Sequence, residues 1–127
     1  MKTLIILAVG ILVVGAVVSS SYSLTYEAEP VIDIWIDRSD GGVYLPGERA
    51  EICLSLSRNL YVLVYEIDAD GYLRLLFPYD CDDDGYLLGG RVYRIGSCGR
   101  RGVLVSGPKG VVYIHAVAST RPFRKLY

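Results

Sequence analysis

The sequence predicts an all-β fold, an antiparallel β-sandwich of about seven short strands that follows one N-terminal hydrophobic helix. Three observations predict it. Apolar and polar residues alternate over several short runs, as they do in strands with one buried face. Gly, Pro and Asp separate these runs at close intervals, as turns do. Beyond the first twenty residues, no stretch shows a helical period.

A β-hairpin over residues 61–78 is the clearest element. Aromatic and β-branched residues fill residues 61–67, which favours a strand. Asp68-Ala-Asp-Gly71 is typical of a turn, because Asp side chains bond to nearby backbone and Gly tolerates a positive φ. The second strand covers residues 72–77 and ends at Pro78, which cannot donate a ladder hydrogen bond.

The other strands are expected on both sides of this hairpin. Pro46-Gly47 favours a type II turn between the two strands that precede the hairpin. A glycine-rich loop over residues 96–102 lacks the Gly-Lys-Ser/Thr ending of a phosphate-binding loop. The expected strands cover residues 31–37, 49–56, 91–95, 103–105 and 110–118.

The N-terminus has the pattern of a targeting segment. Lys2 precedes an unbroken apolar run over residues 4–18, and small residues follow it, as in a secretory signal. An uncleaved anchor is the alternative, because fifteen to seventeen helical residues span about 23–26 Å, slightly less than a ~30 Å hydrocarbon core. In either case we expect the rest of the chain to be extracytoplasmic, in the cell envelope or secreted.

The chain is predicted to hold one folded domain. Its 127 residues divide into a signal peptide or membrane anchor (1–20), a linker (21–30), the sandwich (31–123) and a C-terminal tail (124–127). The whole chain has 13 basic and 14 acidic residues, and removal of Lys2 with the leader leaves 12 against 14. This balance argues against a nucleic-acid partner, since such proteins normally carry a basic surplus.

Three cysteines leave one unpaired if a disulfide forms in an exported protein. Cys81 and Cys98 both lie in loop-like sequence and could pair, which would add about 3 kcal/mol of stability if the geometry allows. Cys53 lies in a predicted strand, where a small apolar role is common.

Several of these motifs together resemble the family known as domain of unknown function 4384. The resemblance covers about residues 31–123 and implies an immunoglobulin-like β-sandwich in a prokaryotic envelope or multidomain signalling protein. It also implies an accessory module, often attached to kinases, peptidases or envelope proteins, with no established catalytic residues. The motifs that carry it are Ile34-Trp-Ile-Asp-Arg38, Tyr44-Leu-Pro-Gly-Glu48, Tyr61-Val-Leu-Val-Tyr65, Asp68-Ala-Asp-Gly71, Leu75-Leu-Phe-Pro78, Gly89-Gly90, Gly107-Pro-Lys-Gly110 and Ala116-Val-Ala-Ser119.

An acidic loop is the candidate metal site. Asp80, Asp82 and Asp84, followed by Gly85, match the first half of a calcium-loop pattern, D-x-D-x-D-G. The second half departs from it, because Arg91 stands where a bidentate Glu would complete the shell. Calcium binding and a solvated acidic turn are both open, and we expect no other cofactor.

The sequence favours a protein that is not an enzyme. His115 is the only histidine and lies inside the last predicted strand. Ser55, Cys53 and Ser119 could be its partners, but no nucleophile elbow or papain-type context surrounds them. One His and three scattered Cys show no C-x-x-C pairing for zinc. A small hydrolase is the remaining catalytic alternative.

Tyrosine is the unusual feature of the composition, with eleven in the chain. Aromatic residues with a polar tip are enriched at protein interfaces, and they also serve as half-buried strand residues. The candidate binding surface comprises Trp35, Tyr79, Tyr86 and Tyr93. We therefore hypothesise an accessory domain that contacts an envelope protein or glycan; the alternative is a structural envelope module with a calcium-stabilised acidic loop.

Overall fold

A computed structural model describes residues 27–39, 41–80, 82–96 and 102–124. The predicted leader, its hydrophobic helix, most of the linker and the Cys81–Cys98 pair lie outside these residues. Within them, no helix has the length and apolar character needed to cross a membrane.

The described residues form nine strands, and every pairing between them is antiparallel. The fold is therefore all-β, as predicted. The strands are β1 (Ile32–Ile36), β2 (Arg49–Ala50), β3 (Ile52–Leu56), β4 (Leu60–Ile67), β5 (Leu73–Phe77), β6 (Tyr86–Leu87), β7 (Val92–Ile95), β8 (Val103–Leu104) and β9 (Tyr113–Ser119).

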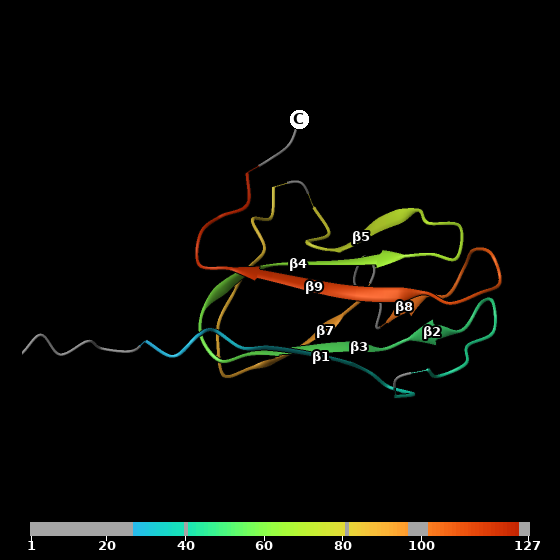
Figure 1. Cartoon of the computed structure of the whole chain (residues 1–127), viewed down its shortest axis with the longest axis horizontal. Coiled ribbons are helices and arrows are strands. Elements are labelled where there is room, and N and C mark those ends of the chain that lie inside the picture. Colours follow the sequence, from blue (N-terminus) through green and yellow to red (C-terminus); the bar gives the residue numbers. More distant parts are fainter. Residues whose placement is uncertain (1–26, 40, 81, 97–101, 125–127) are drawn as a thin grey trace, which may run out of the picture.

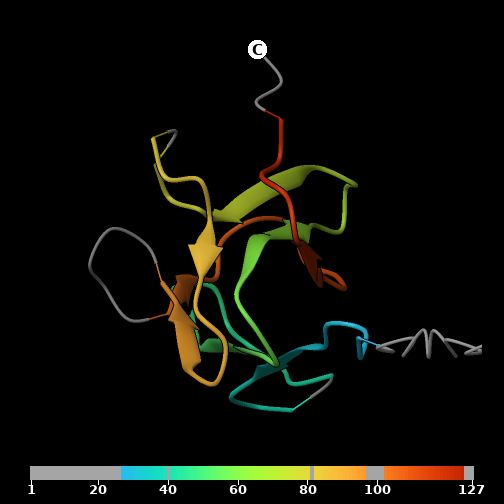
Figure 2. The same ribbon diagram turned by 90° about the vertical axis from the view of Figure 1, so that its left-hand side faces the viewer.

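Two sheets face each other across one core (Figures 1 and 2). In the first, called the β1 sheet, β3 lies between β1 and β7. In the second, called the β4 sheet, β4 pairs with β9 along one edge and with β5 and β6 along the other. The short strands β2 and β8 form a separate pair. β4 is thus a central strand whose two edges are both occupied.

The core lies between β3 and β4. Alternate residues of each strand point inward, so β3 buries every second side chain along its length and β4 does so as far as Val64. These inward residues are at most 3 % exposed, and their removal from water is the main favourable contribution to folding. They are Ile52, Leu54 and Leu56 on β3 and Leu60, Val62 and Val64 on β4.

The two sheets are not closed into a barrel. On the side where β1 and β9 form the edges, inward-facing residues such as Ile34 and Ile114 are only partly buried. They contribute to an apolar groove of about 650 Å³. Cys53, on the outer side of β3, is a partly buried free thiol.

The expected number of about seven strands is too low, for two physical reasons. The predicted strand over residues 49–56 divides at Glu51, because β2 pairs with β8 whereas β3 pairs with β1 and β7. The short strand β6 was not predicted, since two residues are too few to show an alternating pattern.

A polar cluster fixes the turn over residues 44–48 to the end of β1. Arg38 binds Glu48 through both terminal nitrogens (2.9 and 3.1 Å) and lies 4.4 Å from the Tyr44 ring centre. The Tyr44 hydroxyl donates to Asp37 Oδ1 at 2.5 Å, which lowers the pKa of Asp37. The hydrogen bond with Arg38 likewise lowers the pKa of Glu48. Two of the motifs that carry the family resemblance are therefore structural partners of one another.

Candidate contact surface

The outer face of the β4 sheet is the most distinctive surface of the described domain. Every second residue of β4 faces outward, and in an antiparallel ladder directly paired residues share a face. Tyr65 pairs with His115 of β9 and with Leu75 of β5. Repeated along the ladders, this register places Ser119 and ten aromatic or aliphatic residues on one side of the sheet. The ten are called the aromatic face: Tyr61, Leu63, Tyr65, Ile67, Leu73, Leu75, Tyr86, Tyr113, His115 and Val117.

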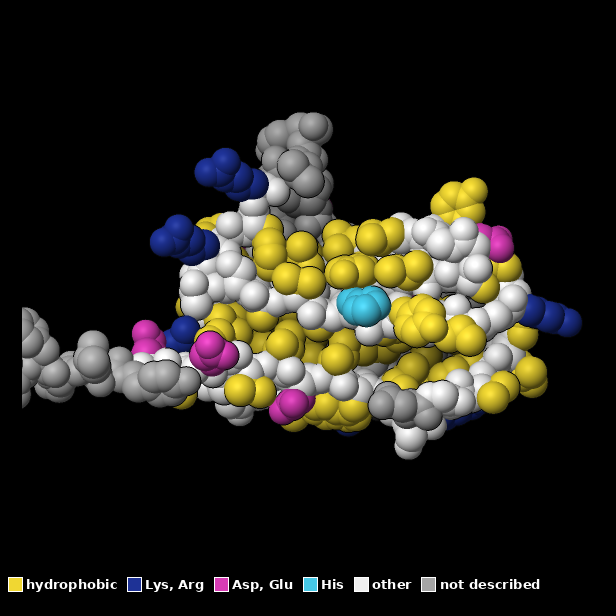
Figure 3. Space-filling view, in the orientation of Figure 1, with side chains coloured by type: hydrophobic (Ala, Val, Ile, Leu, Met, Phe, Trp, Pro, Cys, Tyr) yellow, Lys and Arg dark blue, Asp and Glu magenta, His cyan; other side chains and the backbone are white. Residues whose placement is uncertain are grey.

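No Asp, Glu, Lys or Arg belongs to the aromatic face, although much of it is accessible to solvent. Leu73, Tyr113 and Leu75 are 64 %, 59 % and 51 % exposed. Figure 3 shows hydrophobic side chains around the one histidine on this side of the molecule. Since an exposed sheet face is ordinarily polar, this face has the composition of a buried surface in an accessible position.

Ring contacts order the aromatic face. The His115 ring stacks on Tyr65, with centroids 5.4 Å apart and an interplanar angle of 18°. The Tyr113 ring centroid lies 6.5 Å from that of His115, two residues away on the same strand. At the far end of β4, the Tyr61 and Tyr86 centroids are 4.9 Å apart. The sheet and the neighbouring rings thus restrict the rotamers of each ring. This restriction lowers the side-chain conformational entropy that is lost when a partner binds.

The structure does not gather the four predicted surface residues into one patch. Tyr86 belongs to the aromatic face, whereas Trp35 lies on the outer side of the β1 sheet, opposite Cys53. The Tyr79 hydroxyl accepts a hydrogen bond from Gly96 N (2.6 Å). Tyr93 packs against the core, and its hydroxyl contacts the Leu88 backbone through both N and O (2.9 and 3.0 Å).

Sequence reasoning missed most of the aromatic face, although β4 carried a usable signal. In a strand with one wet face, one of the two alternating sets is polar. In β4 the set of Tyr61, Leu63 and Tyr65 is as apolar as the buried set of Val62 and Val64. This second apolar set indicates either burial on both sides or a contact surface.

The carboxylates of the acidic loop hydrogen-bond to backbone N–H groups. Asp84 Oδ1 accepts from Tyr86 N (3.0 Å), and Asp80 Oδ1 lies 3.4 Å from Asp82 N. Gly85 has a φ of +73°, and a Cβ there would lie 2.5 Å from the Val62 carbonyl oxygen, so the fold itself requires this glycine. Among the described residues, no three His, Cys, Asp or Glu side chains come together as a metal site. Calcium binding at Asp80, Asp82 and Asp84 stays a prediction.

His115 has two aromatic neighbours, namely Tyr65 and Tyr113. A hydrolase would require a nucleophile within hydrogen-bond reach of its imidazole. The ring contacts instead place His115 within a packed aromatic surface, where it adds a polar edge to an apolar face.

Comparison with known proteins identifies one family. Residues 43–122 match the model of a family described as Domain of unknown function (DUF4384). The matched segment contains β2 to β9 and therefore every residue of the aromatic face. Neither the curated proteins nor the solved structures contain a match to this chain.

Proposed function

The chain belongs to the DUF4384 family of domains of unknown function, and from this premise we propose that it is a non-catalytic accessory module that binds a partner protein through the aromatic face. One observation carries the proposal: ten neighbouring residues on an accessible sheet face include no charged side chain. Contiguous apolar patches larger than a few hundred Å² mark interaction sites on soluble domains.

The chemistry of the aromatic face favours a protein over a glycan. Leu73, Leu75 and Val117 lie among the rings and offer no hydrogen bond to a sugar hydroxyl, which would lose its water without compensation. A protein partner can bury these aliphatic groups at about 25 cal/mol for each Å² of apolar surface removed from water. The tyrosine hydroxyls can then form hydrogen bonds at the rim of the contact.

We further infer that the domain is an immunoglobulin-like sandwich and that residues 1–20 export it or anchor it in the membrane. The two facing antiparallel sheets support the first inference, and the apolar run over residues 4–18 supports the second. The mass of the mature N-terminus in cells distinguishes a cleaved leader from a retained anchor.

Site-specific photo-crosslinking in cells tests the contact function. A benzophenone amino acid replaces Tyr113 on the aromatic face, or Trp35 on the outer side of the β1 sheet as the matched control. Both positions are exposed aromatic residues on strands, so the folding cost is comparable. We expect a discrete protein adduct from position 113 and none from position 35.

Three outcomes would count against this function. Equal adducts from both positions would mean non-specific capture, and no adduct from position 113 would remove the aromatic face as a contact site. An adduct that disappears after treatment with glycan-degrading enzymes would assign the face to a glycan.

A further inference from the structure

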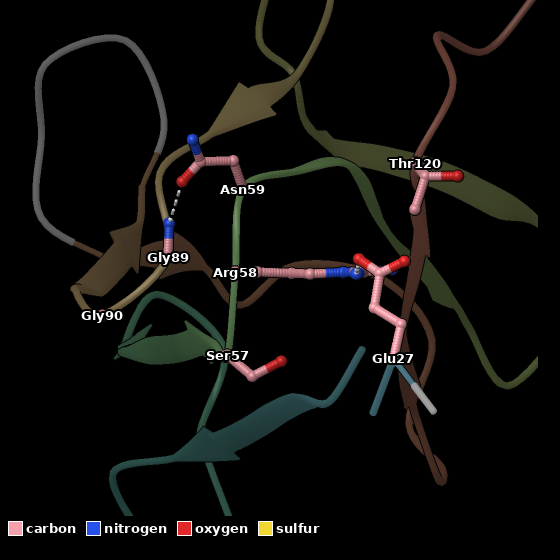
Figure 4. Close-up of a pocket in the computed structure, with 7 residues that line it drawn as sticks. All are labelled: Glu27, Ser57, Arg58, Asn59, Gly89, Gly90 and Thr120. Atoms are coloured by element: carbon pink, nitrogen blue, oxygen red, sulfur yellow. Dashed lines mark hydrogen bonds and ion pairs between the residues drawn. The ribbon is translucent and has the colours of Figure 1, made fainter. Parts of the chain in front are cut away.

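A shallow depression at one end of the two sheets contains a single arginine (Figure 4). Its wall is the β3–β4 turn packed directly on the β6–β7 turn. Asn59 Oδ1 accepts a hydrogen bond from Gly89 N (2.9 Å), and Gly90 N donates to the Leu56 carbonyl (2.9 Å). A Cβ at Gly89 would lie 2.4 Å from the Arg58 Cα, so only glycine allows this approach. The backbone that carries Arg58 is therefore firmly held.

The Arg58 guanidinium is only partly satisfied. Its Nη1 forms an ion pair with the carboxylate of Glu27, toward which the side chain extends in Figure 4. Its Nε is buried and has no hydrogen-bond partner. A buried donor without a partner carries a desolvation penalty, so a ligand that reaches Nε gains more than one that binds Nη1 alone.

Glu27 reaches Arg58 from the segment before β1, and it is the more exposed partner, with 80 % of its side chain accessible against 33 % for Arg58. The segment is attached to the β3–β4 turn further along, where Val31 N donates to Ser57 Oγ (2.9 Å) and Ser57 N donates to the Val31 carbonyl (3.0 Å). Among the described residues lining the depression, Glu27 is the only acid and Arg58 the only base. The group that now occupies the site is thus a carboxylate on a segment that is attached to the β3–β4 turn at Val31.

We propose that Arg58 is a binding site for a carboxylate of a partner molecule and that Glu27 occupies the site until that partner displaces it. The guanidinium fork matches a carboxylate in bidentate geometry, and a bridge across Nε and Nη would satisfy the nitrogen that Glu27 leaves unpaired. Exposed ion pairs contribute little to stability, so the exchange is accessible. This inference does not depend on the aromatic face, and either proposal can fail alone.

The test follows the Arg58 Nε–Hε signal of the full chain by NMR during titration with two small carboxylates. Acetyl-glycine presents only a chain-end carboxylate, and acetyl-glutamate amide presents only a side-chain carboxylate. We expect a saturable shift with at least one of them, which also identifies the source of the carboxylate. Sodium chloride at equal ionic strength should produce no saturable shift.

Two variants identify the residues responsible. Glu27→Gln removes the internal competitor and should lower the apparent Kd about two- to sixfold, as expected from an exposed ion pair. Arg58→Lys removes the planar fork together with its Nε–Hε signal, so the backbone amide of Asn59, which lines the same depression, is followed in the wild type and in this variant. Its shift should saturate in the wild type and not in Arg58→Lys. Glu29→Gln changes another exposed carboxylate of the same segment and should leave the Kd unchanged.

The proposal is wrong if neither carboxylate saturates the Arg58 signal in the wild type or in Glu27→Gln. It is also wrong if Glu29→Gln tightens binding as much as Glu27→Gln, because general electrostatics would then explain the effect. Since Glu27→Gln leaves Arg58 and its packing unchanged, these outcomes remain interpretable even if Arg58→Lys weakens the fold.

Discussion

The outer faces of the two sheets differ, although their inner faces are alike. On the β1 sheet, Asp33 lies outward opposite Ser55, and Arg94 lies outward opposite Cys53 and forms an ion pair with Glu51 at 2.9 Å. On the β4 sheet, the corresponding positions form the aromatic face. Because an antiparallel sheet needs only one apolar face to fold, the second apolar face of the β4 sheet is not explained by folding. The difference places the stabilising apolar contacts between the sheets, and it supports the proposal that the outer side of the β4 sheet binds a partner.

The largest expected effect separates the core from the aromatic face. Leu54→Ala removes a fully buried side chain of β3 and should lower the free energy of unfolding by about 2–5 kcal/mol. Leu75→Ala removes a side chain that is half exposed and should cost less than about 1 kcal/mol. Urea denaturation of both variants measures the difference. Equal costs would mean that the aromatic face is a structural surface, and the comparison would fail.

A smaller effect distinguishes the two outer faces directly. Val117→Lys places a charge within the aromatic face, and Val92→Lys places the same charge on the outer side of the β1 sheet. Both should change stability by less than about 1 kcal/mol, because both positions are exposed. Only Val117→Lys should shorten retention on a hydrophobic-interaction column and suppress the crosslink from position 113. Equal changes in the two variants would contradict the assignment of the contact to one side.

The smallest effect is a local response to acid beside the β1 sheet. The pKa values of Asp37 and Glu48 are lowered by hydrogen bonds with Tyr44 and Arg38 respectively. Such groups contribute stability above their unfolded pKa values of about 3.9 and 4.3, and this stability is lost as the pH falls through the lower folded values. Between pH 7 and pH 5 we therefore expect no change in the turn over residues 44–48.

Amide exchange below about pH 4 tests this expectation. After correction for the intrinsic pH dependence of exchange, Leu45 N and Glu51 N should lose protection, because they donate to Glu48 and Asp37. The Leu63 amide of β4, which has no carboxylate partner of this kind, serves as the reference. Glu48→Gln should remove the acid response at Leu45. If Leu63 loses protection before Leu45 and Glu51 do, the acid response is not local to the turn over residues 44–48.

The fold could largely be predicted from the sequence, whereas the candidate contact surface could not. Alternation and turn residues are local signals, and they located β4 and β5 to within one or two residues. The aromatic face depends instead on register between distant segments, as in the pairing of Tyr65 with His115, fifty positions later. Tyr93 shows the same limit, since its hydroxyl accepts a hydrogen bond from Leu88 N, which no alternating pattern reveals.

The position of β9 has a consequence for the integrity of the chain in cells. β4 is an eight-residue strand with apolar side chains on both faces, and β9 covers one of its two backbone edges. Strands of this composition self-associate when an edge becomes free. Proteolytic loss of residues 113–127 would remove β9 and leave one backbone edge of β4 without hydrogen-bond partners. We expect the shortened domain to aggregate through this edge, so β9 protects the domain from aggregation.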